Sequence, residues 1–139
     1  RYANVYGPRQ NPHGEAGVVA IFCEGLLKKR EFRIHGPGTD TRDYVYVSDV
    51  VRANLAALDS DACSHLNVGT GRQADTNTVY RHLAERLGGP AEVEHGPGRA
   101  GDLRASAVDC GLIERTLGWQ PRVRLEEGLA ETADWFRAN

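Results

Sequence analysis

Arginine, aspartate and asparagine side chains in predicted loops and strand ends are the best candidates for binding chemistry in this sequence. Arg42, Arg99 and Arg104 lie in loops, two of them near glycines, and one guanidinium can bind two oxygens of a diphosphate. Asp102 lies close enough to Arg99 for one ligand to meet a cation and an acceptor for sugar hydroxyls. Asn4, near a strand end, could donate to a phosphate oxygen or simply form a turn. From spacing alone, a solvated surface loop is the more common explanation of the segment around Arg99.

A second candidate is a glycine-rich segment that fits the G-x-G-x-x-A fingerprint of dinucleotide-binding folds, Gly69-Thr-Gly-Arg-Gln-Ala74. It follows a predicted strand and precedes a helix, and Glu92 and Glu94 lie about twenty residues further on, where a ribose-binding carboxylate belongs. Only one full strand–helix unit follows the segment, which is too little for half of a dinucleotide-binding fold. We therefore expect an ordinary strand-to-helix turn.

Groups for acid–base or metal chemistry are few. No tyrosine is followed four residues later by lysine, so the pair that lowers the pKa of a phenol for proton transfer is absent, and the only lysines are Lys28 and Lys29. Asp40, Asp43 and Asp49 lie close in sequence, but Asp49 is expected to cap a helix. The three cysteines and five histidines show no metal-ligand spacing. We assign no catalytic residue and no metal ligand, and we expect a reducing, cytoplasmic location.

Strands and helices that alternate along the chain must position these residues, which predicts an α/β fold. Strands are predicted over residues 1–6, 31–35, 42–47, 65–68 and 91–94. Helices are predicted from 18 with 28–30 in the last turn, from a cap at Ser48 or Asp49 to 58, from a cap at Asp75 or Thr76 to 87, from 109 to 117, and from about 126. In the second helix, one apolar stripe is typical of a face that packs on a core, namely Val51, Leu55 and Leu58.

Length and composition limit the class of protein. The 139 residues are enough for one domain, and we treat residues 1–139 as a single domain or fragment. With 17 basic against 19 acidic residues and a net charge of −2, nucleic-acid binding is not expected as the main function. No apolar run approaches the ~20 residues of a membrane span, so we expect no membrane partner.

Several motifs in a fixed order resemble the nucleotide-sugar epimerases and dehydratases of the extended short-chain dehydrogenase/reductase family, and most closely the UDP-glucose 4-epimerase type within it. The resemblance runs almost from end to end of the chain. The motifs occupy residues 1–10, 15–22, 41–51, 67–71, 99–102 and 117–121, followed by 125–129. Together they are specific for the family but not for one reaction within it.

The resemblance implies which residues hold the phosphates of a nucleotide sugar. Asn4, Arg42 and Arg99 should contact the diphosphate. The backbone amides of Gly17 and Val18, near a helix start, should help to hold the nucleotide, in agreement with the affinity of helix N-termini for anions.

It also implies the remaining contacts. Asp102 should accept from ribose hydroxyls, and Ile34 and His35 should border the base of a UDP-sugar or dTDP-sugar. Tyr2 should lie where the strand approaches the nicotinamide of the NAD cofactor. The turn at residues 69–71 is not the cofactor loop of this family.

Two parts of the family pattern have no counterpart in the sequence, namely the glycine-rich NAD loop and the Tyr-x-x-x-Lys set. The chain is therefore expected to be the C-terminal substrate-binding lobe plus the last strands of a Rossmann-type sheet, inactive alone and binding no NAD by itself. The complete enzyme would use NAD to oxidise and then reduce the sugar. The alternative is a stand-alone nucleotide-sugar binding module that forms a homodimer or pairs with a separate Rossmann chain, because a strand at residues 1–6 would leave an exposed edge.

Overall fold

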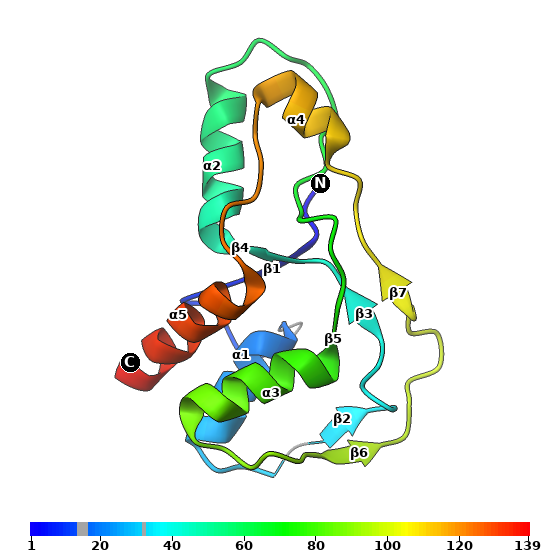
Figure 1. The fold of residues 1–139 in the computed structure, drawn as a ribbon, viewed down its shortest axis with the longest axis vertical. Helices are drawn as coiled ribbons and strands as arrows, with labels where there is room; N and C mark the ends of the chain where they lie inside the picture. The colour runs from blue at the N-terminus through cyan, green and yellow to red at the C-terminus, as the bar shows by residue number, and fades with distance from the viewer. Residues whose placement is uncertain (14–16, 32) are drawn as a thin grey trace.

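The computed structural model describes residues 1–13, 17–31 and 33–139 and confirms the α/β class (Figure 1). Two positions of the second motif, Glu15 and Ala16, and one of the predicted strand 31–35, Phe32, lie outside these ranges. The helices are α1 (Val18–Leu27), α2 (Val47–Leu58), α3 (Thr76–Leu87), α4 (Gly111–Leu117) and α5 (Leu125–Ala138). The strands are β1 (Asn4–Tyr6), β2 (Arg33–His35), β3 (Thr41–Arg42), β4 (Tyr44–Tyr46), β5 (Ala74–Asp75), β6 (Glu94–Gly96) and β7 (Ala105–Ser106).

The strands form three small sheets in which most pairs are parallel. β1 pairs with β4, and β2 pairs with β6, both in parallel. β3 lies between antiparallel β5 and parallel β7. Parallel partners need long crossovers, so each pair joins segments that are distant in sequence. The strand predicted over 65–68 is reduced to a bridge between Val68 and Tyr2, and the one predicted over 91–94 begins only at Glu94.

The first segment of the chain pairs with Val68 through residues 1–3 and with β4 through residues 4–6, so only part of the edge expected at residues 1–6 is paired. The amide of Ala3 donates to the carbonyl of Val68 at 2.9 Å, while residues 4–6 pair with β4. On the side away from β4, the carbonyl of Val5 accepts from Nε2 of Gln10 at 3.1 Å.

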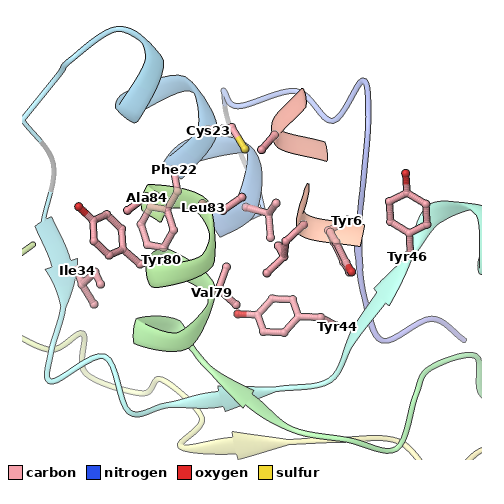
Figure 2. Close-up of a cluster of buried hydrophobic side chains, with 13 residues drawn as sticks. Tyr6, Phe22, Cys23, Ile34, Tyr44, Tyr46, Val79, Tyr80, Leu83 and Ala84 are labelled. Atoms are coloured by element: carbon pink, nitrogen blue, oxygen red, sulfur yellow. The ribbon is translucent and has the colours of Figure 1, made fainter. Parts of the chain in front are cut away.

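The larger hydrophobic core lies where α1, α3 and α5 pack on one another (Figure 2). Phe22 of α1 meets Tyr80 of α3 edge to face, with ring centroids 5.5 Å apart. Tyr6 and Tyr46 from β1 and β4 close the same core, with centroids 5.5 Å apart. A second cluster, around Trp119, lies under α2 and α4. The small sheets thus rest on a helical core, which fixes the strand ends relative to α1.

Helix ends follow the sequence signals at some positions. Asp75 caps α3 by accepting from the amide of Thr78 at 2.6 Å, as predicted. Gly88 and Gly118 end α3 and α4 in the left-handed conformation. The basic residues 28–30 follow α1 and do not form its last turn, so that prediction is wrong.

The start of α2 differs from the prediction, because neither Ser48 nor Asp49 caps it. The helix begins at Val47 after an extended Tyr46, with no side-chain cap. Asp49 lies in the first turn, fully buried, with its Oδ2 atom accepting from the amide of Val123 at 3.1 Å. The carboxylate of Asp49 therefore binds backbone amides of the loop before α5 and does not cap its own helix.

The buried face of α2 is also different from the one expected. The side chains that turn inward are Asp49, Val50 and Ala53. Those of the predicted stripe are exposed, namely Val51, Leu55 and Leu58. Drawing Asp49 inward rotates this stripe toward solvent. In the described part of the chain, no helix has both the length and the apolar character that crossing a bilayer requires.

Candidate functional site

A cavity of about 840 Å³ lies where β1, the start of α1, β2, β3 and the loop after β6 meet. It is lined by all eight residues that were assigned to substrate binding from the sequence. They are Asn4, Gly17, Val18, Ile34, His35, Arg42, Arg99 and Asp102. Residues up to 98 positions apart thus meet at one concave surface, although the structure does not by itself assign a role to any of them.

Two arginines bring guanidinium groups to a cavity that acidic side chains line as well. Arg42 lies on β3, and its Nη1 donates to the carbonyl of Thr41 at 2.9 Å. Nη2 of Arg99 lies 2.9 Å from Nε2 of His35. Neither guanidinium forms an ion pair with a carboxylate among the residues that the structure describes. Both retain donors for an anion, which suits a diphosphate.

The first turn of α1 presents backbone donors at the same cavity. Gly17 precedes the helix in an extended conformation and, lacking a side chain, offers no side-chain acceptor to the first amides of α1. A Cβ atom at Gly17 would lie 2.5 Å from Nε2 of Gln10, so the end of the Gln10 side chain would have to shift. Asn4 on β1 lines the cavity next to this turn. A helix start of this kind favours a negatively charged ligand group.

The other side of the cavity is built by the parallel pair β2–β6. Their register places His35 opposite Gly96, with Ile34 buried beneath. The chain then turns, with the amide of Asp102 directed at the carbonyl of Arg99 at 3.4 Å. This turn brings a carboxylate and a guanidinium to one wall, as expected from the sequence for a loop that grips one ligand at two points.

Sequence reasoning missed several cavity residues. Gln10 lies inside the first motif, which could have pointed to it, and Arg33 alternates with His35 along β2. Arg33 is paired with Glu94 at 2.7 Å, so its charge is largely compensated. Asp40 and Tyr44 line the cavity as well. Burial raises the pKa of Tyr44, so its phenol stays protonated and can donate but cannot act as a base.

The glycine-rich turn at residues 69–71 does not fit a dinucleotide, in agreement with the preferred interpretation. A pyrophosphate would need free backbone amides at this turn. Instead, the amides of Thr70 and Gly71 donate to the buried carboxylate of Asp43 at 2.8 and 2.9 Å. A helix does not follow the turn directly, because β5 intervenes. The site expected of NAD is therefore not formed by these residues.

Two candidates from the sequence lie outside the cavity lining, namely Arg104 and Tyr2. The surroundings of Tyr2 are clear. Its ring is about half exposed, and its hydroxyl donates to Oδ1 of Asn54 on α2 at 2.7 Å. Its assignment to a nicotinamide stays a prediction. Lys28 and Lys29 do not line the cavity either. Within the described residues, no group of three or more metal-ligating side chains is placed to hold an ion.

Comparison with known proteins adds a family. Residues 1–69 match the model of the NAD dependent epimerase/dehydratase family. The chain is 52% identical over 136 residues to a UDP-glucose 4-epimerase of Mycolicibacterium smegmatis, a match that covers 97% of this chain and 44% of the relative.

Solved structures agree with this result. UDP-glucose 4-epimerase from Thermotoga maritima with UDP-glucose is 51% identical, with a TM-score of 0.94, over 99% of this chain and 45% of that one. The Thermus thermophilus UDP-glucose 4-epimerase complex with NAD is 45% identical, with a TM-score of 0.87, over 99% and 45%. The chain therefore spans less than half of the length of the relatives that it matches.

Proposed function

The chain belongs to the NAD dependent epimerase/dehydratase family, and from this premise we propose that it is the nucleotide-sugar binding part of an epimerase such as UDP-glucose 4-epimerase. One observation carries the proposal, namely that a single cavity collects all eight residues expected to contact the substrate. We further propose that residues 1–139 act as one substrate-binding unit. UDP-sugars, or dTDP-sugars, are the ligands we expect.

The chemistry of the cavity supports a division of roles. Arg42 and Arg99 would bind the diphosphate, because their guanidinium groups have no carboxylate partner among the described residues. The amides at Gly17 and Val18 would add backbone donors to the same anion. Asn4 would donate its side-chain amide to a phosphate oxygen.

The remaining polar and apolar groups suit the nucleoside. The Asp102 carboxylate would accept from the ribose hydroxyls, since an ionised carboxylate only accepts. Ile34 and His35 would border the base, at the end of β2. The order diphosphate, ribose, base then follows the cavity from the start of α1 toward the β2–β6 pair.

Binding, and not proton transfer, is the contribution we assign to this chain. Neither lysine lines the cavity, and the phenol of Tyr44, which does, stays protonated. We propose that the 139 residues alone do not interconvert sugars and bind no NAD by themselves, and that Tyr2 lies near the nicotinamide of NAD in the complete enzyme. A homodimer or an association with a Rossmann domain remains a prediction, which the mass of the chain in solution would test.

Isothermal titration with UDP-glucose tests the proposal directly. The chain should bind UDP-glucose, and Arg42→Ala should weaken binding by about tenfold or more, as expected for a lost charge-assisted hydrogen bond. The matched control is Arg104→Ala, because Arg104 lies in the same loop as Arg99 but outside the cavity lining. Unaltered affinity in Arg42→Ala, or equal losses in both variants, would overturn the assignment.

A further inference from the structure

Resting on the proposed function, we propose that Asp43 is a positioning residue that fixes the two phosphate-binding groups Arg42 and Asn4 relative to each other. Asp43 is only 1% exposed and does not line the cavity, so it cannot touch the ligand itself. It stands between β3, which carries Arg42, and β4, which pairs with the strand of Asn4. Its side chain and its backbone both act at this junction.

The carboxylate of Asp43 holds two segments that are distant in sequence. Oδ1 accepts from the amide and the hydroxyl of Thr70 at 2.8 and 2.6 Å. Oδ2 accepts from the amide of Gly71 at 2.9 Å and lies 3.4 Å from that of Val108. A buried carboxylate is tolerated only when such donors satisfy it, so the four contacts fix the side chain in one orientation.

The backbone of Asp43 connects the same point to the cavity. Its amide donates to the carbonyl of Ser106 on β7, and its carbonyl accepts from the amide of Asn4, both at 2.9 Å. Arg42 precedes it directly on β3. The bend between the two sheets is thus set at Asp43, with one phosphate-binding side chain on each side of the bend.

Gly69 explains how the carboxylate reaches its donors. A Cβ atom at this position would lie 2.6 Å from Oδ2 of Asp43 and would also collide with Cγ2 of Val108. The close approach therefore requires glycine. The G-x-G sequence that resembles a dinucleotide fingerprint serves an internal anion, which is the side chain of Asp43.

Asp49 provides a matched comparison. It is also fully buried, and its Oδ2 accepts from the amides of Arg122 and Val123 at 3.0 and 3.1 Å. Its neighbours in sequence do not line the cavity. Asp49 also forms an ion pair with Arg52, so a substitution at Asp49 should cost at least as much stability as one at Asp43, but it should leave the ligand-binding groups in place.

The test compares Asp43→Asn and Asp49→Asn, with UDP-glucose affinity and thermal unfolding measured for each. Asparagine keeps the shape of the side chain but turns an NH₂ group toward backbone donors. Asp43→Asn should weaken binding by about fivefold, the ratio that corresponds to one lost hydrogen bond. Most of this loss should vanish when Arg42 is already alanine. Asp49→Asn should lower the melting temperature and leave the affinity unchanged.

A second readout needs no substrate. The Nε–Hε signal of ¹⁵N-labelled Arg42, assigned by its loss in Arg42→Ala, should show greater mobility in Asp43→Asn than in Asp49→Asn. If the chain failed to bind UDP-glucose at all, the proposed function would be refuted. The mobility of the Arg42 signal would still test the positioning role of Asp43. An unchanged Arg42 signal, or additive losses of affinity with Arg42→Ala, would refute that role. If Asp43→Asn did not fold, Thr70→Val, which removes the hydroxyl donor to Asp43 together with the hydroxyl's contacts to the backbone of Arg72, should give the same effects with smaller size.

Discussion

The guanidinium of Arg99 donates to the imidazole of His35, with 2.9 Å between Nη2 and Nε2. A guanidinium can only donate, so Nε2 of His35 is the acceptor in this contact. The contact joins the last residue of β2 to the loop that follows β6. It holds the side chain of Arg99 at the cavity before any ligand arrives.

Removing this acceptor should weaken UDP-glucose binding. We expect His35→Ala to raise the dissociation constant about fivefold, because Arg99 loses one hydrogen bond that orients it. His35→Gln should recover part of the loss, since the amide oxygen can accept in place of Nε2. The control is His82→Ala on α3, away from the cavity. Equal affinity of His35→Ala and the unaltered chain in titration calorimetry would contradict this role.

Gly128 of α5 is expected to tolerate no larger side chain. A Cβ atom there would collide with the hydroxyl of Tyr6 and lie 2.9 Å from Cδ2 of Tyr46, and both rings are buried. Gly128→Ala should lower the free energy of unfolding by about 1–3 kcal/mol, the usual cost of overpacking, as measured by urea denaturation.

Two further variants check the reason for that loss. Gly111→Ala on α4 should have little effect, because its new Cβ would meet only the ends of the Arg115 and Asp109 side chains. Gly128→Ala should cost less in a Tyr6→Phe background, where the hydroxyl is gone. If the cost were the same in both backgrounds, the collision with Tyr6 would not be its cause.

The three cysteines should differ in reactivity. Cys23 is fully buried in the α1–α3–α5 core, and burial raises its pKa to about 12. The pKa of the partly buried Cys110 is raised for the same reason, whereas Cys63 is exposed. Because the thiolate is the reactive form, iodoacetamide at about pH 8 should modify Cys63 first and leave Cys23 intact.

Peptide mass spectrometry would record this order. In denaturant all three cysteines should react at similar rates, which serves as the control. Labelling of Cys23 as fast as Cys63 in the native chain would show that the core opens readily.

An ion pair between α3 and α5 should make stability depend on pH. Nε of Arg86 donates to Oδ1 of Asp134 at 2.9 Å, and this contact lowers the pKa of Asp134. A carboxyl whose pKa is lower in the folded state stabilises the fold above its unfolded pKa and loses that effect as pH falls through the folded pKa. The difference in melting temperature between the unaltered chain and Asp134→Asn should therefore be present at about pH 7 and shrink below about pH 4.

The size of this difference should be small, because both side chains are about half exposed to solvent. Asp61→Asn is the control, since Asp61 is exposed and has no ion pair among the described residues. A difference that grows on acidification would contradict the sign of the effect.

Sequence periodicity predicted the helices well where apolar residues alone decide the buried face. In α3 and α5 the indicated positions Val79, Leu83 and Leu129 are fully enclosed. In α1 only Phe22 of the predicted repeat is buried. The pattern failed at α2 because the buried face contains Asp49, whose carboxylate is satisfied by amides more than seventy residues away. No local rule detects such a distant partner.

The sequence predicted which residues line much of the cavity, but it did not predict the shape of the cavity. The family resemblance named the eight residues that meet, but Gln10 and Arg33 were missed because their place depends on how β1 and β2 are paired. The sequence also did not predict that the amides of the G-x-G turn donate to the carboxylate of Asp43, because Thr70 and Asp43 are 27 positions apart. Spacing within a motif cannot show which acceptor a turn encloses.

The parallel pair β2–β6 has a consequence for the order in which the molecule assembles. Arg33 and Glu94 are separated by 61 positions, and His35 and Arg99 by 64, so the chain must close long loops before these walls exist. Closing loops of this length loses conformational entropy before the contacts that they bring together can form. Contacts between residues so distant in sequence therefore form slowly. Affinity for a ligand should thus arise only at the end of folding, and a chain that is partly folded, however helical, would remain unable to recognise one.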